Sequence, residues 1–309
     1  MKILMLAPNH IKKFNWTHQL LRNEFKNRHD VVYYGEGYPG YIKDKPVKEI
    51  IKSSKKNFDV IVTHSTKCAE QFTGLGEITD IPKVHIVVDY FPHSSSGDFK
   101  RNHVLFERDK YDIYMAPYMH EIISLKANGY KNSFYFPHCV DIKKYTNHNV
   151  KKIYDIFAVF SLRDDCYPDR RSVLKMIWDM SDKVRAFTSK VYRSEYVRRI
   201  NQSKLCLGNN DIFSSTNIRV FEILACGGFL LTDEAEDFKI LGFKDGINLA
   251  TYENLYELED KIFFYLKNES LMQKISKKGY ELVINNHTTE NRVKTFEEIL
   301  YANGVSASK

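Results

Sequence analysis

The sequence predicts an α/β fold made of two doubly wound, Rossmann-like domains. Short apolar runs alternate with helical patterns along most of the 309 residues, which is typical of mostly parallel sheets covered by helices. This alternation pauses at the polar, proline-containing stretch "FPHCVDIKKYTNHNVKK", residues 136–152, and then resumes. The length also suffices for two hydrophobic cores. We therefore expect a first domain over residues 1–140 and a second over residues 141–309.

The first domain is expected to contain six strands, because it holds six short apolar runs. They cover residues 3–7, 31–34, 60–63, 84–88, 113–116 and 134–136. Helical patterns lie between most of them, including residues 16–27, 47–55 and 118–128. Doubly wound sheets bind ligands outside the carboxyl ends of their strands. We therefore expect the two domains to face one another, with the ligand between those ends.

The second domain repeats the alternation. Strands are expected in "YDIFAVFSL", "VRAFTS", "KLCLGN" and "GFLLTD". Helices are expected at residues 171–179 and 195–202 and in "STNIRVFEILAC". The tail from Leu255 onward reads as helical, and its terminal helices are expected to pack back onto the fold.

Composition is ordinary for a soluble globular protein, with 43% hydrophobic and 28% charged residues, and the scattered cysteines lead us to expect a cytoplasmic location. No stretch approaches the roughly 18 apolar residues of a membrane span, and "KILMLAP" is too short for a signal-peptide core. The five cysteines never form a C-x-x-C pair, which favours reduced thiols and argues against structural zinc. The net charge of +7 fits phosphate-bearing ligands or an anionic acceptor, or simply a lysine-rich composition.

Several motifs are excluded. "GEGYPG" matches G-x-G-x-x-G, but it contains Pro39, follows the second strand and opens no helix, so it does not indicate a dinucleotide site. The sequence contains no P-loop, no D-x-D, no zinc-spaced His/Cys set and no G-x-S-x-G elbow. These absences argue against a metal-dependent glycosyltransferase layout and against an α/β-hydrolase.

Glu222 occupies an unusual place. Ile218, Phe221, Glu222 and Ala225 follow the spacing of one buried helix face, so a carboxylate fills an apolar slot. An unpaired buried carboxylate costs several kcal/mol and therefore needs a partner. One interpretation is an internal salt bridge, for example with Arg219. The other is that the hydroxyl groups of a ligand donate to the carboxylate.

Polar residues crowd the start of the same helix, at Ser214, Ser215, Thr216 and Asn217. Such residues cap helices, and the free N–H groups with the helix dipole form an anion site. Plain capping explains one of these residues but not the whole cluster. Phosphate binding is the interpretation that accounts for all of them.

Three arginines follow the first strand of the second domain in "SLRDDCYPDRR", namely Arg163, Arg170 and Arg171. This is the carboxyl end of that strand, where ligands bind, and guanidinium forks suit diphosphate oxygens. The alternative interpretation is a solvated helix start.

These residues carry a resemblance. Residues 155–292, with "YDIFAVFSL", "INQSKLCLGN", "STNIRVFEILACGGFLLTD", "LYELEDKIFFYLKN" and "HTTENR", resemble the glycosyltransferase group 1 domain in its spore-maturation, CgeB-like branch. The resemblance implies a GT-B fold that binds a nucleotide sugar, with a UDP-sugar as the expected donor, and needs neither a metal nor another cofactor. It implies that Glu222 accepts hydrogen bonds from the ribose and that the helix N-terminus holds the diphosphate.

The predicted donor-binding set is Arg163, Arg170, Arg171, Ser215, Thr216, Asn217, Arg219 and Glu222. Relatives often carry a second glutamate eight positions before the ribose glutamate, where this chain has Ser214. That departure leaves the donor-sugar contacts and a retaining mechanism open.

The first domain supplies the catalytic candidates. "VHIVVDYFPH" ends a strand at the expected ligand site, so Asp89 is a candidate general base on the acceptor hydroxyl. His93 is a candidate for contacting the donor sugar or stabilising the leaving phosphate. The alternative interpretation is a strand-end cap for Asp89 and a surface loop for His93.

Three functions remain open at this point. The leading hypothesis is sugar transfer to a small molecule, a polymer precursor or a protein. The second is sugar transfer to hydroxymethylated bases in DNA, which the basic residues Lys100, Arg101, Arg193, Arg198 and Arg199 permit. The third is a catalytically idle module that binds a nucleotide or a partner, which Ser214 keeps open.

Overall fold

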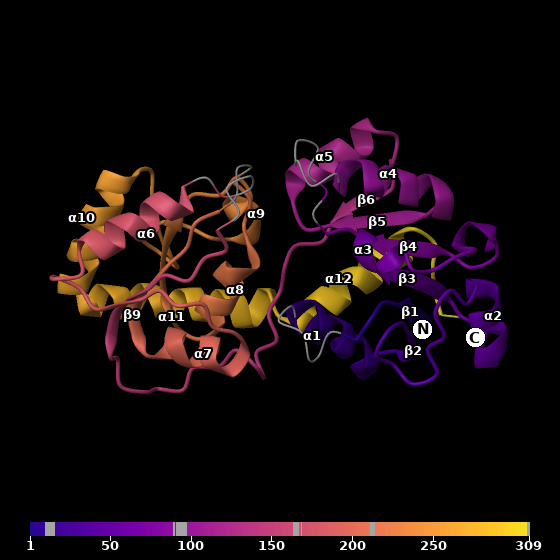
Figure 1. The fold of residues 1–309 in the computed structure, drawn as a ribbon, viewed down its shortest axis with the longest axis horizontal. Helices are drawn as coiled ribbons and strands as arrows, with labels where there is room; N and C mark the ends of the chain where they lie inside the picture. The colour runs from indigo at the N-terminus through magenta and orange to yellow at the C-terminus, as the bar shows by residue number, and fades with distance from the viewer. Residues whose placement is uncertain are drawn as a thin grey trace. The chain divides into compact units, whose positions relative to one another are not determined.

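The computed structural model describes residues 1–9, 16–88, 90, 98–162, 167, 169–210 and 214–307. The chain divides into two compact units (Figure 1). The first combines Met1–Pro137 with Arg292–Lys309, and the second is His138–Asn291. Among the described residues, no helix is both long and apolar enough to cross a membrane.

The first unit contains a six-stranded parallel sheet with the order β2-β1-β3-β4-β5-β6. Its strands are β1 (Lys2–Leu6), β2 (Asp30–Tyr34), β3 (Val60–His64), β4 (Lys83–Ile86), β5 (Ile113–Ala116) and β6 (Ser133–Tyr135). Ile3 pairs with Val31 on one side and with Val60 on the other, so the direction of winding reverses between β1 and β3. All six expected strands are confirmed, with their ends shifted by at most two residues.

Helices cover the strands of this unit. They are α1 (Trp16–Glu24), α2 (Val47–Ser54), α3 (Thr66–Ala69), α4 (Asp98–Asp109) and α5 (Met119–Ala127), with short 3-10 turns η1 (Phe25–Asn27) and η2 (Leu75–Glu77). Every residue of β3 is buried, as expected for a parallel strand with both faces covered.

The last helix, α12 (Thr289–Ala302), contributes most of its length to the first unit, although the sequence analysis assigned residues 141–309 to the second domain. The reason is its apolar stripe. Phe296 is fully buried and packs edge-on against Phe25, with ring centroids 4.8 Å apart. Glu297 accepts two hydrogen bonds from Arg28, at 2.8 and 2.7 Å. Sequence periodicity predicts a buried stripe but does not say which core it fills.

The second unit contains a five-stranded parallel sheet with the order β11-β10-β9-β7-β8. Its strands are β7 (Tyr154–Phe157), β8 (Ala186–Phe187), β9 (Ser203–Leu207), β10 (Phe229–Asp233) and β11 (Ala250–Tyr252). Its helices are α6 (Arg170–Asp179), α7 (Arg193–Asn201), α8 (Ile218–Ala225), α9 (Phe238–Leu241), α10 (Leu255–Lys267) and α11 (Glu269–Asn286). The expectation of two parallel-sheet α/β domains is thereby confirmed.

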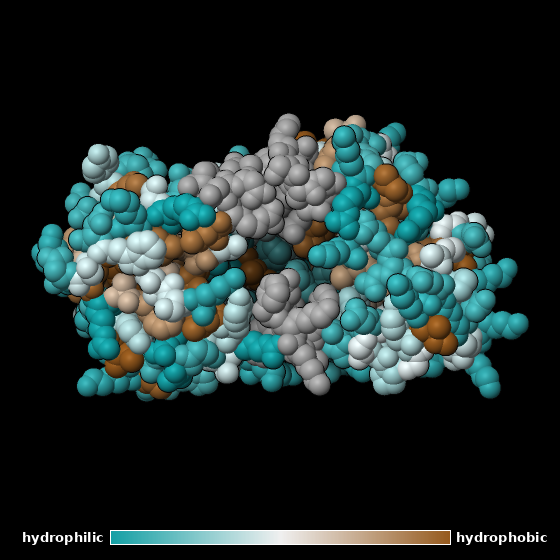
Figure 2. Space-filling view, in the orientation of Figure 1, coloured by the Kyte–Doolittle hydropathy of each residue, from teal (hydrophilic) through white to brown (hydrophobic). Residues whose placement is uncertain are grey.

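The surface shown in Figure 2 is largely hydrophilic, with apolar residues scattered among polar ones. Exposed apolar side chains such as Ile42, Trp178 and Tyr256 lie far apart in the sequence. Single exposed apolar residues of this kind are normal on folded proteins.

Candidate functional site

The candidate site lies at the carboxyl edge of the second sheet, where the loops after β7, β9 and β10 meet the start of α8. Arg170 connects two of these loops. Its side chain is only 2% exposed, and it donates to the carbonyl oxygen of Ser161 at 3.1 Å and to that of Asn209 at 2.6 Å. Its guanidinium carbon lies 3.3 Å from the centre of the Tyr167 ring. Arg170 therefore stabilises the loops that surround the predicted phosphate site.

The other two arginines of the predicted set are placed differently. Arg171 follows Arg170 at the start of α6 and is exposed. Arg163 lies outside the described residues. A contact between any of the three and a diphosphate stays a prediction.

Asn217 is the N-cap of α8. Its side-chain oxygen accepts a hydrogen bond from the backbone N–H of Arg219 at 3.0 Å. Its amide nitrogen donates to Asn210 Oδ1 at 3.0 Å and to the Asn209 carbonyl at 3.4 Å. One side chain thus caps the helix and fixes its start against the loop after β9, which orients the positive end of the helix dipole.

The residues before Asn217 are held by hydrogen bonds to the loop after β10. Thr216 donates to Asp237 Oδ1 through its backbone N–H, at 3.1 Å, and through its hydroxyl. Ser215 is buried, whereas Ser214 is exposed and has a left-handed φ of +49°. The carbonyl of Ser214 accepts a hydrogen bond from the N–H of Glu236 at 2.9 Å. Helix capping by Asn217 and the contacts of Thr216 with Asp237 therefore account for these two residues as well as phosphate binding does.

Glu222 is buried, with 7% of the residue exposed. Its Oε1 accepts a hydrogen bond from the Tyr145 hydroxyl at 2.7 Å. Burial raises the pKa of Tyr196 well above its usual value, and the nearby Glu222 charge raises it further. Burial likewise raises the pKa of Cys226, with smaller contributions from Cys206 and Glu222. Arg219 opposes this effect on Tyr196, because its positive charge and its hydrogen bond lower the pKa of the Tyr196 hydroxyl.

Several residues of this edge were missed by sequence reasoning. Asp233, at the end of β10, accepts from the N–H of Asn210 at 2.8 Å and from the Asn209 amide at 3.3 Å. Burial raises its pKa, because desolvation outweighs those hydrogen bonds. The strand-end pair "NN" was a possible signal for this network. The sequence gives no signal for Tyr145, because this residue lies in the polar segment that was interpreted as the connection between the domains.

At the carboxyl edge of the first sheet, the prominent residue is Arg22. It is 1% exposed and donates to the Pro8 carbonyl at 3.1 Å and to Gln19 Oε1 at 3.0 Å, and its Nη1 lies 3.5 Å from His64 Nδ1. Burial lowers its pKa, and no carboxylate among the described residues contacts it. Asp89 and His93, the predicted catalytic pair, lie outside the described residues.

The two parallel-sheet units have the GT-B fold of glycosyltransferases. Residues 163–298, which include Arg170, Asn217 and Glu222, match the family model described as glycosyl transferase-like. The match covers most of the second unit. It does not resolve the CgeB-like branch, which stays a prediction. Comparison with curated proteins gives no match.

Among similar solved structures, sucrose-phosphate synthase from Thermosynechococcus elongatus has a TM-score of 0.67 at 12% identity, with 100% of both chains covered. HepE from Anabaena, in complex with UDP and glucose, has a TM-score of 0.72 at 13% identity, covering 98% of this chain and 100% of HepE. A glycosyltransferase from Rickettsia africae has a TM-score of 0.64 at 13% identity, with 99% of each chain covered. At such identities the similarity establishes the fold alone.

Proposed function

We propose that this protein transfers a sugar from a nucleoside diphosphate sugar, with a UDP-sugar as donor, to an acceptor hydroxyl without a metal ion. The glycosyl transferase-like match over residues 163–298 supports the reaction class. HepE, a structure of the same fold, is known in complex with UDP-glucose, which supports the donor class.

The observation that carries the proposal is the buried carboxylate of Glu222. Tyr145 occupies one hydrogen-bonding position of Oε1, and a carboxylate offers about four such positions. We expect ribose hydroxyls to donate to this carboxylate alongside Tyr145. Such charge-assisted hydrogen bonds select a ribose over a ligand that lacks the hydroxyl groups.

The start of α8 is the proposed diphosphate site. Its N-terminal N–H groups and dipole favour negative charge, and Asn217 holds them in place. Charge develops on the leaving diphosphate during transfer, so fixed positive dipoles at this position stabilise the transition state. Asp89 as general base and His93 as a donor-sugar or phosphate contact complete the proposal.

The test begins with a thermal-shift screen of UDP-, GDP- and ADP-sugars, followed by mass spectrometry of candidate acceptors with and without EDTA. We expect stabilisation by a UDP-sugar and transfer that continues in EDTA. Loss of transfer in EDTA, restored by a divalent ion, would reject metal independence. Binding without hydrolysis or transfer would instead support the catalytically idle module.

A further inference from the structure

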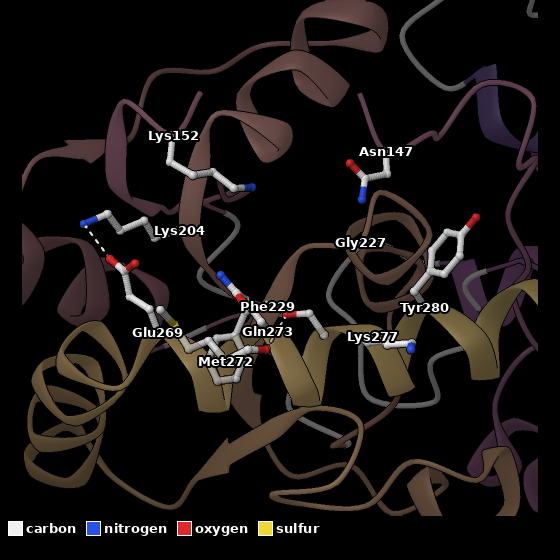
Figure 3. A pocket seen from close by; sticks show the side chains of 11 residues that line it. Asn147, Lys152, Lys204, Gly227, Phe229, Glu269, Met272, Gln273, Lys277 and Tyr280 are labelled. Atoms are coloured by element: carbon white, nitrogen blue, oxygen red, sulfur yellow. Dashed lines mark hydrogen bonds and ion pairs between the residues drawn. The ribbon is translucent and has the colours of Figure 1, made fainter. Parts of the chain in front are cut away.

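A pocket of about 320 Å³ with a mixed polar and apolar lining opens at the amino ends of β9 and β10, at the sheet edge opposite Asn209 and Asp233. Its volume is at the lower end of the range for small-molecule sites. One wall is a face of α11, where Glu269, Gln273 and Lys277 recur at four-residue intervals. Lys152 and Asn147, from the segment before β7, enter from the side opposite α11 (Figure 3).

The lining combines polar groups with a substantial apolar surface. Phe229 and Met272 are buried and contribute the apolar part of its lining. Gly227 has a left-handed φ of +68°, and a Cβ atom there would lie 2.7 Å from the Asn147 amide nitrogen. Glycine at this position therefore allows Asn147 to reach the pocket.

Of the three lysines that line the pocket, Lys204 is neutralised. Its amine lies 3.2 Å from Asp155 and 3.2 Å from Glu269. These two carboxylates raise its pKa. The charges of Lys204 and Glu269 therefore neutralise each other. The remaining positive charges of the pocket are those of Lys152 and Lys277.

Lys152 lacks such a counter-charge. Its amine donates to the neutral carbonyl of Asn201 at 2.8 Å, which uses one of three N–H donors. No carboxylate among the described residues lies within ion-pair distance of it, and burial lowers its pKa. The nearby Cys206 thiol is neutral, because burial raises its pKa to about 12.

Lys277 is similarly available. Its side chain is 77% exposed, and its amine lies 4.0 Å from Glu281, at the limit of an ion pair. The two ammonium groups therefore come from different sides of the pocket, Lys152 from the segment before β7 and Lys277 from α11 (Figure 3). Gln273 and Tyr280 add polar groups on the same wall.

We propose that this pocket binds a small phosphorylated polyol, with Lys152 contacting the phosphate and with Lys277 and the amide and hydroxyl groups of Asn147, Gln273 and Tyr280 contacting the polyol. A phosphomonoester carries close to two negative charges at neutral pH, and the ammonium group of Lys152 offsets part of that charge. Lysine is a compact charge that suits phosphate oxygens. The site is separate from the proposed nucleotide-sugar site, because it lies at the opposite edge of the sheet.

The experiment is calorimetric titration of the full chain with ribose 5-phosphate, ribose and inorganic phosphate at matched ionic strength. We expect ribose 5-phosphate to bind more tightly than the other two. Lys152→Gln and Lys277→Met should each weaken binding by roughly ten- to a hundredfold, as expected for a lost charge-assisted hydrogen bond. Lys278→Met removes the same charge from an exposed position of α11 outside the pocket and should change affinity less than about twofold.

Three results would overturn the proposal. The first is no binding of ribose 5-phosphate at roughly 10 mM, the weakest affinity the titration detects. The second is wild-type affinity in both Lys152→Gln and Lys277→Met. Lys277 is exposed, so its variant should fold even if Lys152→Gln does not. The third is displacement of ribose 5-phosphate by UDP-glucose, which would place the phosphate in the nucleotide-sugar site.

Discussion

Glu222 and Tyr145 are partners that lie 77 residues apart in the sequence. The periodicity of α8 predicted a buried carboxylate and therefore a need for hydrogen-bond donors. It could not identify Tyr145, because a tyrosine in a polar connecting segment carries no signal of its own. The chemistry of one residue was thus predictable, whereas its partner depended on how the segment before β7 folds back.

Replacement of Glu222 by glutamine tests the ribose contact. Glutamine keeps the shape and an acceptor for Tyr145 but removes the charge. A charge-assisted hydrogen bond contributes about 1.5–3 kcal/mol, so UDP-sugar affinity should fall by roughly ten- to a hundredfold in calorimetry. Glu298→Gln makes the same change at an exposed position of α12 and should bind as wild type does. Equal affinity in both variants would reject the ribose contact.

Whereas Glu222 is a buried carboxylate, Arg22 is a buried cation, and its hydrogen-bond partners are neutral groups. We expect Arg22→Met to leave the free energy of unfolding within about 1 kcal/mol of wild type, because the removed desolvation cost offsets the lost hydrogen bonds. Arg28→Met should cost more in urea unfolding, because it leaves Glu297 without its bidentate partner. If Arg22→Met lowers the free energy of unfolding by more than about 3 kcal/mol, Arg22 stabilises the fold and is not a group retained for function.

At the scale of elements, the strands were the most predictable part. Buried parallel strands read as short apolar runs, as the fully buried β3 does. The helix α4 gave a weaker signal, because "DFKRNHVLFERD" mixes charged and apolar residues. The destination of α12 could not be predicted at all, since packing against Phe25 depends on a contact between the two ends of the chain.

The N-cap of α8 has two functions that can be separated. Asn217→Ala should lower the free energy of unfolding by about 0.5–2 kcal/mol, the usual cost of a lost cap. It should also weaken UDP-sugar binding, because Asn217 fixes the start of α8 against Asn210. Asn254 caps α10 in the same way, through the N–H groups of Tyr256 and Glu257. Asn254→Ala should therefore lose similar stability but keep donor affinity. Identical binding by the two variants would contradict a donor role for the α8 N-terminus.

At the scale of the whole molecule, the predicted roles fall in different units. The residues proposed to bind the donor belong to the second unit, whereas Asp89 follows β4 of the first. Alternation of strands and helices was sufficient to predict both units. Their exact composition was not predictable, because Arg292–Lys309 returns to the first unit through side-chain packing rather than through any sequence boundary.

Asp89→Asn separates donor binding from catalysis. If Asp89 is the general base, turnover should fall by about two to four powers of ten, the usual contribution of such a group. Donor affinity should stay unchanged, because the donor is expected to rest on the second unit. Asp80→Asn makes the same change at an exposed position of the first unit and should leave turnover unaltered. Calorimetry with the donor and single-turnover rates with the identified acceptor measure the two quantities. A retaining enzyme can pass the acceptor proton to a donor phosphate oxygen, so near-wild-type turnover would reject the base and favour retention of configuration.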